Sequence, residues 1–196
     1  MSKTRLEAFS DGVIAILITI MVLELQPAGA LPHGTDFAAL RPLLPIFLTY
    51  VLSFVMLGIY WNNHHHMLHM VDRSTGGILW ANLHLLFWLS LLPFVTGWMG
   101  ENHSAPLPTA LYGIVGIGSA VAYTILQKTI IRSQGPKSRL AAAVESDIKG
   151  KASLTMYAAA MALAFVNHWL SDALYVAVAL MWLVPDPRIE KRLGTR

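Results

Sequence analysis

Long stretches without a charged side chain constrain this 196-residue chain more than any other feature of its sequence. Asp, Glu, Lys and Arg are absent over 42–71, 74–100 and 102–127, which are runs of 30, 27 and 26 residues. A helix needs roughly 20 apolar residues to cross the hydrocarbon layer of a bilayer, and each run supplies them. Hydrophobic residues make up 55% of the chain, more than one core can bury, so part of the surface must face lipid. The sequence therefore predicts an all-α integral membrane protein.

Six membrane-spanning helices in one domain, 1–196, account for the apolar segments. We place them at about 4–25, 43–62, 77–99, 107–127, 152–170 and 172–185. The last two are predicted to form a tight hairpin that turns at the polar pair Ser171-Asp172. Pro93 is expected to kink the third span, and three glycines of the fourth span are expected to mark close helix contacts: Gly113, Gly116 and Gly118.

Basic residues are sorted between alternate ends of these spans. Of the 14 Lys and Arg residues, 13 lie before or at the start of the first span, in 63–76, in 128–151 or in the tail after 185. The alternate loops contain only Arg41. Because cytoplasmic loops carry an excess of Lys and Arg, this distribution predicts that both termini are cytoplasmic.

The first span also permits a second interpretation, as a secretory signal peptide. Residues 12–23 are uncharged, Lys3 and Arg5 precede them, and Ala28-Gly29-Ala30 resembles a cleavage site. However, Glu7 and Asp11 introduce acid where a signal peptide is basic. We therefore favour a first helix that takes charged residues into the membrane.

The chain lacks the residues that several classes of function require. The chain has no cysteine, no glycine-rich nucleotide-binding motif, no nucleophile elbow and no paired catalytic carboxylates. A net charge of +3 is too small to indicate a nucleic-acid partner. We therefore expect no enzymatic activity, no cofactor and no nucleic-acid binding.

Polar residues from three predicted spans form the first candidate site. Trp61 and His65 are spaced i,i+4 on the second span, at the same membrane depth as Arg5 and Asp11. Asn82, early in the third span, needs partners in lipid and is a further member of this cluster.

Two other interpretations of these polar residues are open. Arg5 and Glu7 can snorkel to the cytoplasm while Asp11 only caps the apolar stretch. The histidines His64, His65, His66 and His69 can bind a metal ion, although no H-E-x-x-H motif accompanies them.

An aliphatic stripe on the first span is the second candidate site. Ile16, Ile20 and Leu23 are spaced 4 and then 3 residues apart, and Thr19 lies beside them. Such a stripe packs against a neighbouring helix, or it forms a dry constriction when identical helices surround an axis. Periodicity alone does not separate these two possibilities.

The start of the first span, R-x-x-x-F-S-D, resembles the signature of the transmembrane protein 175 family of potassium-permeable channels. The motif consists of Arg5, Phe9, Ser10 and Asp11. Further matches are G-I-Y-W-x-N-H-H at 58–65, Asn82, and L-L-P-F at 91–94. The resemblance implies a prokaryotic six-helix unit that assembles as a homotetramer in the plasma membrane. It also implies a K+ pathway without a P-loop filter, lined by the first helix of each subunit.

The resemblance assigns roles to both candidate sites. Ile16 matches the constricting isoleucine, Ile20 and Leu23 match further hydrophobic rings, and Thr19 matches a layer that influences selectivity. Arg5, Ser10 and Asp11 support the pore through hydrogen bonds, with partners matched by Trp61, His65 and Asn82. Two other functions remain as alternatives: a proton-coupled transporter that uses Asp11, His65 and Glu24, and a membrane scaffold that transports nothing.

Overall fold

A computed structural model describes residues 2–25, 37–103, 105–136, 138–143 and 148–183, and within these ranges every regular element is a helix. In chain order the elements are α1 (Lys3–Ile20), η1 (Met21–Leu25), η2 (Phe37–Leu43), α2 (Leu44–His69), α3 (Gly76–Ser90), α4 (Leu92–Glu101), α5 (Pro106–Gln134), α6 (Arg139–Ala143), α7 (Ile148–Leu163) and α8 (His168–Leu183). The all-α prediction is confirmed for this part of the chain. The cleavage-site candidate at 28–30 and the basic residues after 185 lie outside the described residues.

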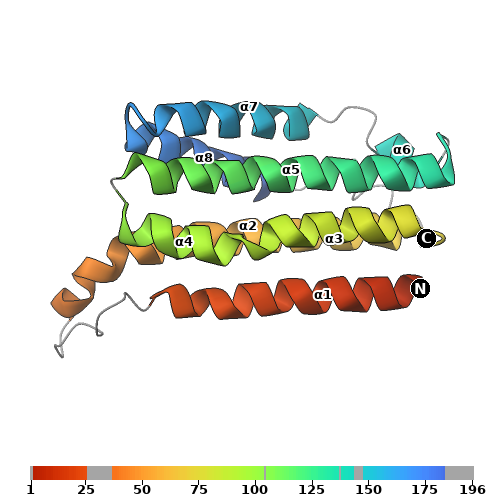
Figure 1. Ribbon diagram of the computed structural model, residues 1–196, viewed down its shortest axis with the longest axis horizontal. Coiled ribbons are helices and arrows are strands. Elements are labelled where there is room, and N and C mark those ends of the chain that lie inside the picture. Colours follow the sequence, from red (N-terminus) through yellow and green to blue (C-terminus); the bar gives the residue numbers. More distant parts are fainter. Residues whose placement is uncertain (1, 26–36, 104, 137, 144–147, 184–196) are drawn as a thin grey trace.

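The long helices run side by side along the longest axis of the molecule (Figure 1). Helix α1 occupies one edge of the bundle, where it packs against α2 and α3, and α7 and α8 form the opposite edge. Helix α5 lies between, in contact with α3, α4 and α7. One side of α1 is therefore packed, and its other side faces out of the subunit.

Four helical segments of the described residues are long and apolar enough to cross a membrane: Lys3–Leu25, Phe37–His69, Gly76–Glu101 and Pro106–Gln134. They contain the first four predicted spans. Helices α7 and α8 have 16 residues each, so each reaches about 24 Å at 1.5 Å per residue. They lie where the fifth and sixth spans are predicted, but they are shorter than a full crossing.

The hairpin between α7 and α8 turns earlier in the chain than predicted. Helix α7 ends at Leu163 and α8 begins at His168, so Ser171 and Asp172 lie inside a helix. Asn167 caps α8, since its side-chain oxygen accepts a hydrogen bond from the Trp169 amide at 3.0 Å. The Ser171 hydroxyl is buried and donates to the Ala160 carbonyl across the hairpin at 2.8 Å. Because a neighbouring helix satisfies its hydroxyl, Ser171 can lie within α8, and the turn that its polarity suggested is not needed.

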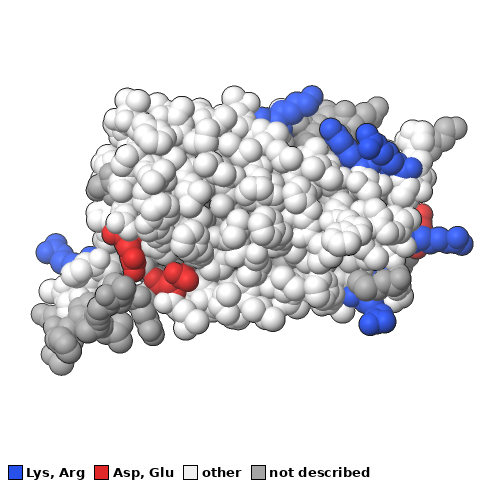
Figure 2. Space-filling model, in the orientation of Figure 1, with Lys and Arg blue, Asp and Glu red and all other residues white. Residues whose placement is uncertain are grey.

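Two spans continue further toward the basic end of the bundle than predicted. Helix α2 extends to His69, which places all four histidines of the 64–69 segment on the helix. Helix α5 extends to Gln134 and stops at Gly135, whose φ of 90° is favourable for glycine and unfavourable for other residues. The predicted 128–151 loop is therefore shorter, and α6 lies within it. Lys and Arg side chains concentrate at this end of the molecule (Figure 2).

Proline and glycine have the expected effects on the helices. The third predicted span is interrupted at Leu91, one residue after α3 ends, and Pro93 stands in the first turn of α4. The three α5 glycines lie against aromatic side chains: Gly113 against Tyr175, Gly116 against Tyr157 and Gly118 against Trp88. The prediction of close helix contacts at these glycines is confirmed.

Replacing Gly116 by Ala is expected to lower the free energy of unfolding by about 1–3 kcal/mol, because overpacking forces neighbouring groups to move. An added Cβ would lie 2.6–2.9 Å from ring atoms of the buried Tyr157. Gly58 in α2 is the matched control, since a Cβ there meets nothing within 4 Å. Thermal unfolding in detergent checks this: G116A should melt earlier than G58A, and equal midpoints would contradict the packing argument.

Candidate functional site

Helix α1 buries one of its faces against the rest of the subunit. The buried residues recur every three or four positions and form one stripe: Leu6, Ser10, Ile14, Leu17 and Met21. Ser10 is the polar member, and its hydroxyl donates to the Leu6 carbonyl one turn earlier at 2.9 Å. The motif serine therefore points into the subunit.

The predicted aliphatic stripe lies on the outer side of α1 and continues into η1, which contains Leu23. Ile16 is 59% exposed, Ile20 40% and Leu23 61%, so no described helix of the same chain covers them. Thr19 is also exposed, and its hydroxyl donates to the Ile16 carbonyl at 2.9 Å. Phe9 of the motif is likewise exposed. Packing against a helix of the same subunit therefore does not explain this stripe.

A buried hydrogen-bond chain fixes α1 to α3 and α2. The Asn82 side-chain amide donates to the Ser10 hydroxyl at 2.9 Å, and the Asn82 carbonyl oxygen lies 2.7 Å from Nε2 of His64. All three side chains have no exposed surface. Because the Ser10 proton goes to Leu6, Ser10 accepts from the amide, and His64 must donate from Nε2. The chain therefore has a single direction, from His64 to the Leu6 carbonyl.

His64 is a site residue that the spacing argument missed, because that argument assigned the cluster to His65. The buried positions of α2 include Ser53, Leu57, His64 and Leu68, which recur at helical spacing. The sequence of α2 is largely apolar on all sides, so its periodicity did not single out His64, and the packing of the helix places His64 on the buried face. No described residue bonds to the buried Nδ1 of His64.

A second, more exposed group surrounds Asp11 at the edge of α1. The Trp61 indole donates to one carboxylate oxygen of Asp11 at 3.1 Å, and Nδ1 of His65 lies 4.0 Å from the other. The Trp61 and His65 rings lie side by side, with centroids 6.1 Å apart. Arg5 is exposed, and its guanidinium makes no hydrogen bond with a described residue. The structure thus unites Asp11 with Trp61 and His65, and Ser10 with Asn82, while Arg5 stays apart.

The histidines near the end of α2 contact one another and α1. His65 and His69 stack with ring centroids 6.2 Å apart, and Lys3 donates to the His69 carbonyl at 2.6 Å. The described residues contain no group of three His, Asp or Glu side chains placed to hold a metal ion. In this structure the His65 ring instead lies beside Asp11 and Trp61.

Comparisons with known proteins point to one family. The sequence model of the family described as endosomal/lysosomal potassium channel TMEM175 matches residues 5–93. A potassium channel from Chryseobacterium sp. (strain P1-3) is 53% identical over 193 residues, 98% of each chain. Another from Streptomyces collinus is 31% identical over 95% of each chain. The crystal structure of a lysosomal potassium-selective channel TMEM175 homolog from Chamaesiphon minutus matches with a TM-score of 0.76 and 25% identity, covering 93% of this chain and 96% of that one.

Proposed function

This chain belongs to the TMEM175 family, and on that premise we propose that it is a potassium-selective channel whose pore is lined by α1 from four identical subunits. The observation that carries the proposal is the aliphatic stripe Ile16, Ile20 and Leu23 on the outer side of α1 and η1. Four such faces around an axis would form successive narrow, dry rings, and ions would cross only when those rings are wetted.

The buried chain of Ser10, Asn82 and His64 supports the same proposal. A pore-lining helix must keep its orientation, since a rotation of one residue, 100°, would turn Ile16 away from the axis. Buried hydrogen bonds to α3 and α2 resist such a rotation, because breaking them leaves polar groups unsatisfied. Ser10, Asn82 and His64 would therefore act on permeation by holding α1, outside the path of the ions.

The placement of the charged residues supports permeation by cations and favours one orientation of the protein in the membrane. We propose six membrane-embedded helices in a prokaryotic plasma membrane, with the basic end in the cytoplasm. Acidic side chains lie at the opposite end of the molecule (Figure 2). Glu24 of η1, which directly follows α1, and Glu101 of α4 are near enough to interact, and they place acidic groups near the outer end of α1. Such groups would raise the local concentration of cations at the outer mouth.

Selectivity for K+ over Na+ should be modest. Aliphatic side chains have no oxygen to replace the hydration shell of an ion, and only the Thr19 hydroxyls and backbone carbonyls offer one. The constriction therefore acts through the cost of removing water from the ion. Na+ holds its water more tightly than K+, so K+ crosses more easily.

Reversal potentials measured after reconstitution test the proposal. In planar bilayers with KCl on one side and NaCl on the other, the reversal potential should have the sign expected when K+ is more permeant than Na+. Unitary current steps distinguish a channel from the proton-coupled transporter, which would give saturable flux that follows a pH gradient. Absence of any cation current in protein that is shown to be tetrameric would refute the proposal.

A further inference from the structure

The outward face of α5 changes from apolar to basic along its length. Ile114, Val121 and Ile125 are 43%, 40% and 41% exposed, and Lys128 and Arg132 follow them toward the end of the helix. The successive spacings of 7, 4, 3 and 4 residues place all five on one face. This stripe, called here the α5 stripe, is therefore continuous from the middle of the membrane to its basic end.

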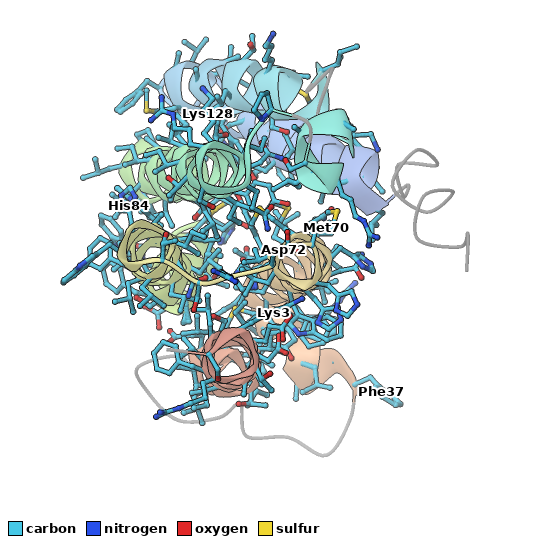
Figure 3. All side chains as sticks on the ribbon, turned by 90° about the vertical axis from the view of Figure 1, so that its right-hand side faces the viewer. Lys3, Phe37, Met70, Asp72, His84 and Lys128 are labelled. Carbon is cyan, nitrogen blue, oxygen red and sulfur yellow. The ribbon has the colours of Figure 1, made fainter. Side chains whose placement is uncertain are left out.

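No acidic side chain offsets these cations on the helices that surround them. Helices α3, α5 and α7 contain no Asp or Glu, whereas α5 and α7 carry Lys128, Arg132, Lys149 and Lys151. Lys128 and Arg132 are exposed and form neither a hydrogen bond nor an ion pair with a described residue. Figure 3 shows Lys128 on the same side of the bundle as His84 of α3, away from α6. Two adjacent turns of α5 thus present positive charge outward.

An exposed aromatic residue lies at the same depth. Trp80, in the second turn of α3, is 76% exposed. Its helix touches α5 there, because a Cβ added at Gly77 would lie 3.5 Å from Cγ2 of Thr129, the neighbour of Lys128. Indole rings favour the boundary between hydrocarbon and headgroups, since one edge is apolar and the N–H is polar. Trp80 therefore places Lys128 and Arg132 at headgroup level.

We propose that the α5 stripe binds an anionic phospholipid of the cytoplasmic leaflet. The Lys128 ammonium and the Arg132 guanidinium would hold the phosphate, Trp80 would lie near the ester groups, and an acyl chain would follow Ile125, Val121 and Ile114. A free phosphate ion would use the two cations but none of the adjoining apolar surface. Because the two cations and the apolar side chains lie on one face, the α5 stripe fits a lipid better than a free phosphate ion. This inference is independent of the ion that the protein conducts.

Native mass spectrometry of the purified protein with phosphatidylglycerol or phosphatidylcholine tests the lipid site. The unsubstituted protein should retain phosphatidylglycerol more strongly than phosphatidylcholine. Neutralising both cations, in K128Q/R132Q, should weaken phosphatidylglycerol binding by about fivefold for each charge, hence about 25-fold. The charge-keeping variant K128R/R132K should bind nearly as well as the unsubstituted protein. Soluble glycerol phosphate, which lacks acyl chains, should not displace the lipid.

The matched control is R73Q/R139Q, which removes the same charge at the same end of the bundle but outside the α5 stripe. Arg73 lies in the turn between α2 and α3, and Arg139 begins α6. Equal weakening by the two double variants would overturn the proposal, because binding would then follow total charge. Displacement by glycerol phosphate would overturn the lipid assignment. A change in oligomeric state of K128Q/R132Q without a change in lipid binding would identify the stripe as a contact between subunits, and would also overturn it.

Discussion

Replacing Ile16 by Asn is expected to raise the single-channel conductance by about threefold to tenfold, since each ~1.4 kcal/mol removed from a barrier multiplies the rate about tenfold. Ile16 is 59% exposed on the outer face of α1, where the proposed constriction needs an apolar side chain. An amide there would keep the ring wet and offer oxygen ligands to ions of either kind. The K+ over Na+ permeability ratio should therefore fall as conductance rises. Single-channel recording with reversal potentials under a K+/Na+ gradient measures both quantities.

Leu48 on α2 is a matched control for this substitution. It is 58% exposed, nearly the same as Ile16, but it lies on a different helix. Leu48→Asn introduces the same amide into an equally exposed aliphatic position, so general damage from a polar group in the membrane would affect both variants. We expect conductance and selectivity to change only in I16N. An I16N current indistinguishable from that of the unsubstituted channel would remove Ile16 from the pore.

The spans were predictable because the bilayer imposes a length that charge-free runs reveal directly. The runs over 42–71, 74–100 and 102–127 overlap most of the helical segments Phe37–His69, Gly76–Glu101 and Pro106–Gln134. The same reasoning did not predict the turn of the last hairpin correctly. Polar Ser171 suggested a turn, whereas the fold satisfies its hydroxyl with the Ala160 carbonyl of the adjacent helix. Hydrogen bonding across helices depends on tertiary packing, which a charge count does not contain.

The sequence predicted which helices contribute side chains to the candidate site, but not every residue of it. Helical spacing put Trp61 and His65 on one face near Asp11, and the structure places both side chains beside that carboxylate. Spacing did not decide which of two adjacent histidines enters the core. His64 does so because it continues the buried face of α2, and there it meets Asn82.

Replacing Asn82 by Leu is expected to lower the free energy of unfolding by about 1–3 kcal/mol, the cost of leaving a buried polar group unsatisfied. The variant removes the acceptor for Nε2 of His64, whose Nδ1 already has no partner among the described residues. It also removes the donor that ties Ser10 of α1 to α3. We therefore expect an earlier thermal midpoint in detergent and a reduced open probability, since α1 loses its buried anchor. Asn63→Leu is the control, because the Asn63 side-chain amide donates to the Ile59 carbonyl of its own helix and does not tie α2 to another described helix.

A double variant separates the contribution of the hydrogen bond to stability from the effect of changing side-chain volume. Removing both partners of a buried bond costs less than removing one, since no polar group remains unsatisfied. H64L/N82L should therefore be more stable than the sum of the two single substitutions implies, with a coupling of about 1 kcal/mol or more. Additive effects would show that the 2.7 Å contact contributes nothing specific. In that case α1 would be held to α3 by the Asn82–Ser10 hydrogen bond and by its buried face, without a contribution from His64.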